Sequence, residues 1–226
     1  MAPQPRTIGD LRLVPPDLEP RDGWTGDVWT GEPPDDDVDD VLAEDQDWSD
    51  LELIGARIAA SHLAGVDLTD ASWRNVKLVG CRLERVDLSG ARLEGATIDR
   101  CEFVGCRMTG LQLLDATVKN TVFEDCRLDY ANLVGVRTTG PAALLDCVLA
   151  KANLTNCRLP QLALVRCRLA AAELHDCDLH GADLRGNDLS ELLGLASLAG
   201  VRIDSTQLPA LAAVATRDLR IVVDDA

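Results

Sequence analysis

The chain has 226 residues, only 3% of them aromatic, and its 22 basic residues against 38 acidic ones give a formal net charge of −16. A chain this acidic repels DNA and anionic membrane surfaces, which argues against direct contact with nucleic acid or membrane and favours a basic protein partner. The first residues contain no apolar run as long as a signal peptide and no segment could cross a bilayer, so we expect a cytoplasmic protein whose cysteines are reduced thiols.

Residues 1–45 are rich in proline, glycine and aspartate, a composition that predicts an acidic, flexible tail. Residues 1–50 hold 15 acidic and 3 basic side chains, so most of the net charge lies there and the rest of the chain is close to neutral. Two near-duplicate tryptophan segments predict a docking motif that folds on a partner; the alternatives are a solubilising tail or a flap folded on the first coil. The candidate partner contacts in this tail are Trp24, Trp29, Asp35, Asp36 and Asp37.

From Trp48 onward a bulky apolar residue returns at every fifth position, and a mostly small residue lies two positions before each one. A five-residue period fits neither a helix nor a long strand, because both would turn many of these side chains into water. A short extended segment followed by a corner keeps both series facing inward. Coils stacked about 4.8 Å apart would then satisfy the backbone hydrogen bonds.

The units Val66-Asp67-Leu68, Ala131-Asn132-Leu133, Ala152-Asn153-Leu154 and Ala182-Asp183-Leu184 resemble the A-(D/N)-L-x-x motif of the pentapeptide-repeat family. The resemblance covers residues 46–189. It implies an all-β solenoid, a right-handed quadrilateral β-helix with four units per coil and about seven coils.

The five-residue spacing is broken once, because eleven residues separate Thr138 from Leu149. The extra residue must lie within 139–146, a stretch that contains Gly140 and Pro141. We therefore predict a bulge or a small loop there, with a bend in the rod.

The inward positions define a predicted core. All eight cysteines fall two residues before a central residue, where alanine stands in other units. Cys106, Cys126, Cys147 and Cys167 should stack in one column, where a buried thiol packs as a small apolar group; a metal or disulfide site is the alternative, but the chain has no C-x-x-C pair. The other core residues that we single out are Leu83, Leu88, Phe103, Phe123, Leu128, Leu154, Leu169 and Leu184.

Residues 190–226 should cap the last coil, with a short helix near 206–216. Thr206 is the expected N-cap, and Leu208, Leu211 and Ala215 would share the face that covers the coil. Ile221, Val222 and Val223 would add a strand or pair with a second subunit, which gives a homodimer through the C-terminal segment.

The chain offers no catalytic, cofactor or metal-binding constellation. His62, His175 and His180 fall at outward positions without a nucleophile beside them. Arg107, Arg127 and Arg168 should share one wall with aspartates toward its N-terminal end, which is a docking surface or simply a solvated wall. We therefore expect a non-enzymatic interaction or scaffold module. The resemblance also implies an alternative, a DNA-mimicking protector of DNA gyrase, against which the near-neutral body counts.

Overall fold

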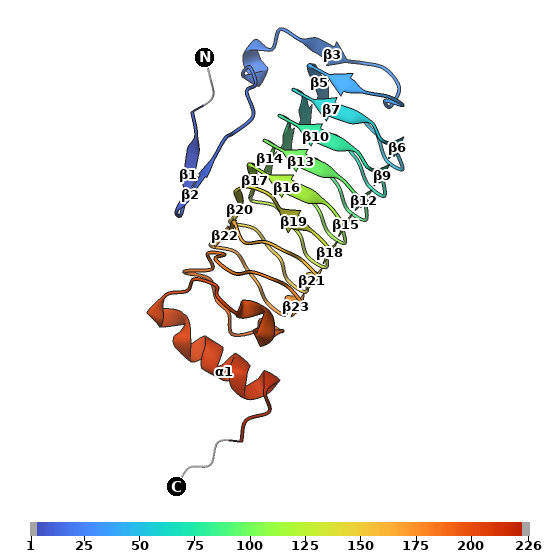
Figure 1. Ribbon diagram of the computed structural model, residues 1–226. Helices are drawn as coiled ribbons and strands as arrows, with labels where there is room; N and C mark the ends of the chain where they lie inside the picture. The colour runs from blue at the N-terminus through green and yellow to red at the C-terminus, as the bar shows by residue number, and fades with distance from the viewer. Residues whose placement is uncertain (1–3, 223–226) are drawn as a thin grey trace.

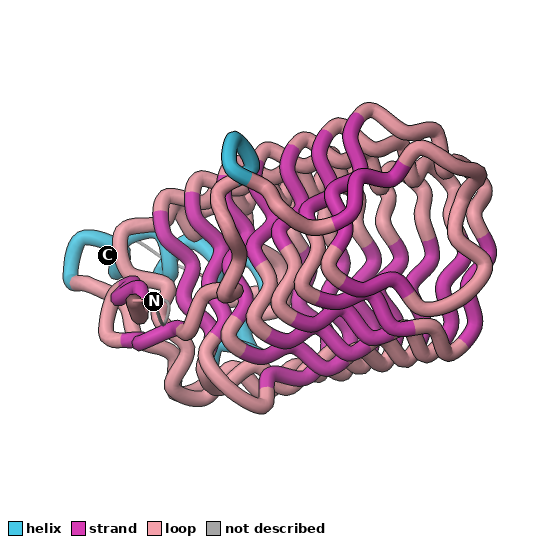
Figure 2. Tube along the Cα trace, turned by 90° about the horizontal axis from the view of Figure 1, so that it is seen from above, coloured by secondary structure: helices cyan, strands magenta, loops and turns pink. Residues whose placement is uncertain are grey.

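Each five-residue unit forms one short strand and one corner, and the computed structural model describes residues 4–222 as a β-solenoid of about seven coils (Figure 1). Strands of successive coils pair in parallel and in register, as Leu83 does with Leu63 and with Phe103. The predicted fold class is confirmed. Seen from above, the strands of successive coils stack side by side into long walls (Figure 2).

Three walls are sheets. The seven-stranded wall holds β6 (Glu52–Ile54), β9 (Ser72–Arg74), β12 (Arg92–Glu94), β15 (Gln112–Leu114), β18 (Asn132–Val134), β21 (Asn153–Thr155) and β23 (Glu173–His175). The six-stranded wall holds β4 (Val38–Asp39), β7 (Arg57–Ala59), β10 (Lys77–Val79), β13 (Thr97–Asp99), β16 (Thr117–Lys119) and β19 (Arg137–Thr138). The eight-stranded wall holds β3 (Asp27–Trp29), β5 (Val41–Glu44), β8 (His62–Ala64), β11 (Arg82–Glu84), β14 (Glu102–Val104), β17 (Thr121–Glu124), β20 (Ala142–Leu145) and β22 (Leu162–Val165).

The fourth side, which we call the bridge wall, is held by single-residue β-bridges. These run in order through Asp47, Asp67, Asp87, Arg107, Arg127, Val148 and Arg168.

The interior follows the predicted pattern, since all twelve residues chosen as core are buried. The cysteines are buried, unpaired thiols, and each Sγ in the long column contacts backbone carbonyls, as Cys126 does with Phe103 at 3.5 Å. This column ends at a polar side chain. The side-chain oxygen Oδ1 of Asn187 accepts a hydrogen bond from the backbone amide of Cys167 at 2.8 Å. The columns are therefore packed stacks whose last backbone groups are satisfied.

The extra residue is placed by the strand register. Val118 pairs with Thr138, twenty residues on, whereas Thr121 pairs with Ala142, twenty-one residues on. The insertion therefore lies between Thr138 and Ala142, inside the predicted range. Pairing of β17 with β20 and of β20 with β22 continues past it, so the wall is not interrupted.

The N-terminal segment differs from the flexible tail expected over 1–45. Strands β1 (Arg6–Ile8) and β2 (Leu11–Leu13) form an antiparallel hairpin, and η1 (Arg21–Gly23) follows it. The hairpin lies beside β17, β20 and β22, and the chain then runs back along the rod to β3 (Figure 1). We call residues 6–26 the strap. Ile8 and Leu13 are buried against Val122 and Leu145 on the outside of the eight-stranded wall, and this apolar burial holds the segment in place.

The C-terminal cap contains η2 (Leu195–Leu198), η3 (Ser205–Gln207) and helix α1 (Leu208–Asp218), which lies across the last coil (Figure 1). The predicted N-cap Thr206 instead lies inside η3, whose N-cap is Asp204 in a capping box with Gln207, and α1 follows η3 directly. Within α1, Val214 is buried and Leu211 is partly buried, whereas Leu208 is 56% exposed. The prediction for Leu208 was therefore wrong.

Beyond α1, Ile221 and Val222 form no strand, and Val223 lies outside the described residues. No helix within residues 4–222 is long and apolar enough to span a membrane.

Candidate interaction surfaces

The strap occupies the eight-stranded wall. Arg6 pairs with Glu124 at 2.8 Å, Asp10 pairs with Arg202 at 2.5 Å, and Arg21 with Glu44 at 3.1 Å. These ion pairs span most of the length of the rod and add to the apolar contacts of the hairpin. The chain itself therefore covers part of this wall.

Both tryptophans chosen as candidate contacts pack on the solenoid. Trp24 meets His62 edge to face, with 5.0 Å between ring centroids, and Trp29 meets Trp48 in the same way at 5.8 Å. Of the alternatives, the flap folded on the first coil describes this arrangement. Trp24 holds the strap against β8, and Trp29 covers the N-terminal end of the interior.

His62 is buried, although it was expected on the surface. The strap covers it, and its Nε2 lies 3.0 Å from the carbonyl oxygen of Glu19, so the neutral imidazole donates this hydrogen bond. Burial lowers the pKa of His62 below its usual value, and the nearby Arg82 and Arg21 act in the same direction. The imidazole thus serves as a neutral anchor for the strap.

The acidic run Asp35, Asp36 and Asp37 is exposed at the N-terminal end of the rod. Asp37 Oδ1 accepts the backbone amide of Arg57 at 2.7 Å, which satisfies an N–H at the end of the six-stranded wall. Asp37 therefore has a structural partner, while the other two carboxylates face solvent.

The bridge wall carries a change of charge sign along its length. Asp47, Asp67 and Asp87 are followed in the next coils by Arg107 and Arg127. Arg107 pairs with Asp87 at 2.8 Å, at the point where the sign changes. Partial burial would raise the pKa of Asp87, but hydrogen bonds from Ser89 and Arg107 outweigh it and hold that pKa below its usual value.

A shallow groove of about 360 Å³ opens where the bridge wall meets the eight-stranded wall. We call it the arginine groove; the charged residues that line it are Arg85, Asp87, Arg107, Asp125 and Arg127. The guanidinium groups of Arg107 and Arg127 are about two-thirds exposed, with side-chain exposures of 66% and 67%. Exposed guanidinium groups are suited to paired hydrogen bonds with carboxylates.

Two of the three arginines predicted as contacts, Arg107 and Arg127, line the groove. Arg85 also lines it and was not predicted from the sequence. Arg168 stands two coils further along, beyond Val148, and does not line it. Arg85 holds a corner with a left-handed φ of 53°. Gly105 occupies the same corner one coil later, and its lack of a side chain leaves the groove open. This alternation of large and absent side chains at one corner is the signal that could have identified Arg85.

The cysteine columns offer no reactive group at their centre. Hydrogen bonding to the adjacent thiol of the preceding coil, together with burial, raises the pKa of Cys126 and of Cys147 to about 12. These thiols are protonated at neutral pH. Within residues 4–222 no three His, Cys, Asp or Glu side chains are grouped as metal ligands.

Comparison with known families identifies the repeat. Residues 76–141 match a model described as "Pentapeptide repeat region", and residues 52–90 and 147–190 match one described as "Pentapeptide repeats (8 copies)". The chain is a pentapeptide-repeat protein. No curated protein matches its sequence.

Several solved pentapeptide-repeat proteins are similar to this one. Trypsin-treated QnrB1, described as a plasmid-mediated fluoroquinolone resistance protein, is 16% identical with a TM-score of 0.48, over 89% of this chain and 100% of its own. HetL from the cyanobacterium Nostoc, described as involved in heterocyst differentiation regulation, is 18% identical with a TM-score of 0.39, over 74% of this chain and 83% of its own. Rfr23 from the cyanobacterium Cyanothece is 17% identical with a TM-score of 0.32, over 68% of this chain and 91% of its own. Likenesses this distant show the fold alone.

Proposed function

We propose that this pentapeptide-repeat protein is a non-enzymatic interaction module whose partner binds along the bridge wall. The observation that carries the proposal is the reversal of charge on that wall, from Asp47 and Asp67 at one end to Arg107 and Arg127 at the other. A protein surface that is basic at one end and acidic at the other would complement it. Such a pairing fixes both the position and the direction of the partner on the rod.

The arginine groove is the proposed specific contact within this wall. An acidic side chain of the partner would enter between Arg107 and Arg127, whose guanidinium groups are exposed and already oriented by Asp87 and Asp129. The overall acidity of the chain acts at longer range and speeds the approach of a partner with a basic patch. The scaffold supplies rigidity, because every coil is hydrogen-bonded to its neighbours.

Affinity purification of the tagged protein from its native cytoplasm tests this. Proteins that co-purify with the wild type should be lost with the double variant Arg107→Glu/Arg127→Glu, and weakened by Asp47→Lys/Asp67→Lys. Arg74→Glu is the matched control, since Arg74 is an exposed arginine on the seven-stranded wall. An unchanged set of partners with both double variants would contradict the proposal.

A second candidate function is protection of a type II topoisomerase, DNA gyrase, by mimicry of duplex DNA. The ordered N-terminal segment favours it, because Asp35, Asp36 and Asp37 lie at the N-terminal end of the rod instead of trailing from it, which makes that end more negative than the repeats alone. A gyrase supercoiling assay with a quinolone decides the matter. Restored supercoiling at micromolar protein would support mimicry. If supercoiling is not restored, this candidate function is ruled out.

We further propose that two copies pair through the C-terminal segment. Leu208 at the start of α1 and Leu219, Ile221 and Val222 at and after its end are exposed apolar side chains, with Val222 79% exposed, and burying them in a second copy would remove them from water. Light scattering should give the mass of a dimer, and Leu219→Asp should give that of a monomer. A monomeric wild type at tens of micromolar would disprove the pairing.

A further inference from the structure

The two halves of the solenoid interior are filled by different side chains. Trp48, Trp73, Phe103 and Met108 fill the N-terminal half, and all four are almost fully buried. Phe123 is the last aromatic residue in the interior, and the central residues from Leu128 onward are nearly all leucine. Because leucine is smaller than tryptophan and phenylalanine, the C-terminal half has less side-chain volume to fill its interior.

The exposure of equivalent leucines records this difference. Leu63 and Leu83 have no accessible surface, whereas Leu144 and Leu164, at the same inward position of the eight-stranded wall, keep 8% and 9%. Phe103 keeps 2% and Phe123, one coil further on, 9%. All of these side chains point into the rod, so the remaining surface faces internal space.

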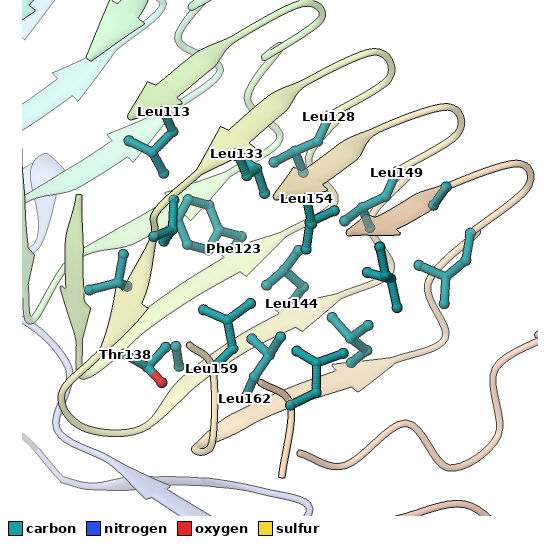
Figure 3. A pocket seen from close by; sticks show the side chains of 18 of the residues that line it. Leu113, Phe123, Leu128, Leu133, Thr138, Leu144, Leu149, Leu154, Leu159 and Leu162 are labelled. Atoms are coloured by element: carbon teal, nitrogen blue, oxygen red, sulfur yellow. The ribbon is translucent and has the colours of Figure 1, made fainter. Parts of the chain in front are cut away.

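That space is an apolar cavity of about 90 Å³, which extends from Leu111 to Leu192 along the rod axis. Phe123 and Leu144 of the eight-stranded wall, Leu154 of the seven-stranded wall and Leu159 surround it and point into it (Figure 3). Thr138 is the only lining residue with a polar side chain, and its hydroxyl oxygen is buried without exposure to the cavity. The accessible lining therefore consists of carbon atoms.

A cavity lined in this way excludes water, because a buried water needs two to four polar partners. We propose that this cavity is a binding site for one small apolar molecule of the size of xenon or a short hydrocarbon. An engineered apolar cavity of about 150 Å³ takes up benzene or xenon, which sets the scale. At about 90 Å³ the present cavity takes xenon without rearrangement, and benzene only with movement of leucine side chains.

The site can be blocked by one substitution. Phe103 and Phe123 stack with 4.6 Å between ring centroids, and Leu144 pairs with Phe123 in the next coil. Leu144→Phe would continue this stack into the cavity. The matched control is Leu83→Phe, which extends the same stack from its other end into the closely packed half, where Leu83 pairs with Phe103.

Xenon is the probe, applied under pressure to the full-length protein with its leucine methyl groups labelled for NMR. We expect methyl shifts in Leu144, Leu154 and Leu159, and none in Leu63. Leu144→Phe should abolish these shifts and raise Tm by a few degrees, whereas Leu83→Phe should keep the xenon shifts and lower Tm.

The measurement on the wild type stands even if a variant does not fold. Absence of methyl shifts at saturating xenon, or shifts spread equally over both halves, would overturn the proposal. Ordered water in this cavity in a crystal structure would overturn it as well.

Discussion

Corner residues explain part of the acidity of the chain. The last residue of most units has a left-handed φ, and among the non-glycine residues at such positions more than half are Asp or Asn, including Asp50, Asp70 and Asn75. These are the side chains that tolerate this conformation best after glycine. Many of the aspartates are therefore required by the turns of the backbone. Net charge alone is thus a weak guide to the partner, and the position of each charge on a wall is a better one.

Neighbouring residues on the bridge wall should respond oppositely to the same substitution. Leu128 is buried and Arg127 is exposed. Leu128→Asp should lower the free energy of unfolding by about 4 kcal/mol or more, because it places a charge in an apolar interior. Arg127→Asp should change it by only about 0.5 kcal/mol. Urea denaturation measures both, and equal losses would refute the assignment of inward and outward positions.

Two inward threonines should also differ. The Thr138 hydroxyl is buried without a partner, whereas that of Thr121 donates to the Lys119 carbonyl at 2.8 Å. Thr138→Val should raise the free energy of unfolding by about 1 kcal/mol, and Thr121→Val should lower it by a similar amount. Chemical denaturation of the two variants side by side is the test. A loss on Thr138→Val would mean that this hydroxyl has a partner.

At the scale of elements, the repeat could be predicted and the terminal elements could not. Every unit has the same surroundings, so a local pattern such as Ala152-Asn153-Leu154 is sufficient to identify its strand. The hairpin residues Ile8 and Leu13 follow no period, and their contacts lie more than a hundred residues away. For α1, the predicted face was partly wrong, because Leu208 is the first residue of the helix and points to solvent, while Val214 and Leu211 face the coil. Of the three arginines that line the arginine groove, Arg107 and Arg127 were predicted as contacts from the sequence. Arg85 was not, because it lies at a corner of its coil.

The anchor between the strap and β8 should make stability depend on pH. An unfolded imidazole binds a proton near its ordinary pKa of 6.5, and His62 in the folded protein binds one only at lower pH. Below about pH 6.5 the unfolded state therefore binds more protons than the folded state. The contribution of His62 to the free energy of unfolding is fully present above this pH and is lost as the pH falls below it.

Replacing His62 tests this pH dependence. His62→Gln can keep the donor to the Glu19 carbonyl without titrating, and it should flatten the loss between about pH 7 and pH 5. His180→Gln, at an exposed histidine, serves as the control. Melting curves across this range measure the difference. An unaltered pH profile in His62→Gln would contradict the role of the anchor.

At the scale of the whole molecule, the strap ties distant coils together. Coils of a solenoid contact only their neighbours, so each can open almost independently of the far end. The strap joins η1 near β5 and β8 to the hairpin near β22, and the Asp10–Arg202 ion pair extends this link to the C-terminal cap. Opening of one end is thereby coupled to the other.

Leu13→Asp should release the hairpin while the coils remain folded. Leu13 is 1% exposed and packs on the outside of the eight-stranded wall. We expect the variant to bind a hydrophobic dye at the uncovered patch and to be cleaved by protease within residues 14–26, with little change in its circular dichroism. Arg12→Asp, at an exposed position of the same strand, should leave the hairpin resistant.

The position of the hairpin has a consequence for synthesis on the ribosome. The hairpin residues Arg6 to Leu13 are translated more than a hundred residues before the strands that receive them, β17 to β22. At about 5 to 20 residues per second, the hairpin waits for several seconds beside a growing stack. The hairpin thus finds its place only after strands far along the chain have formed, and a protein truncated before β17 would carry a loose hairpin with Ile8 and Leu13 in water.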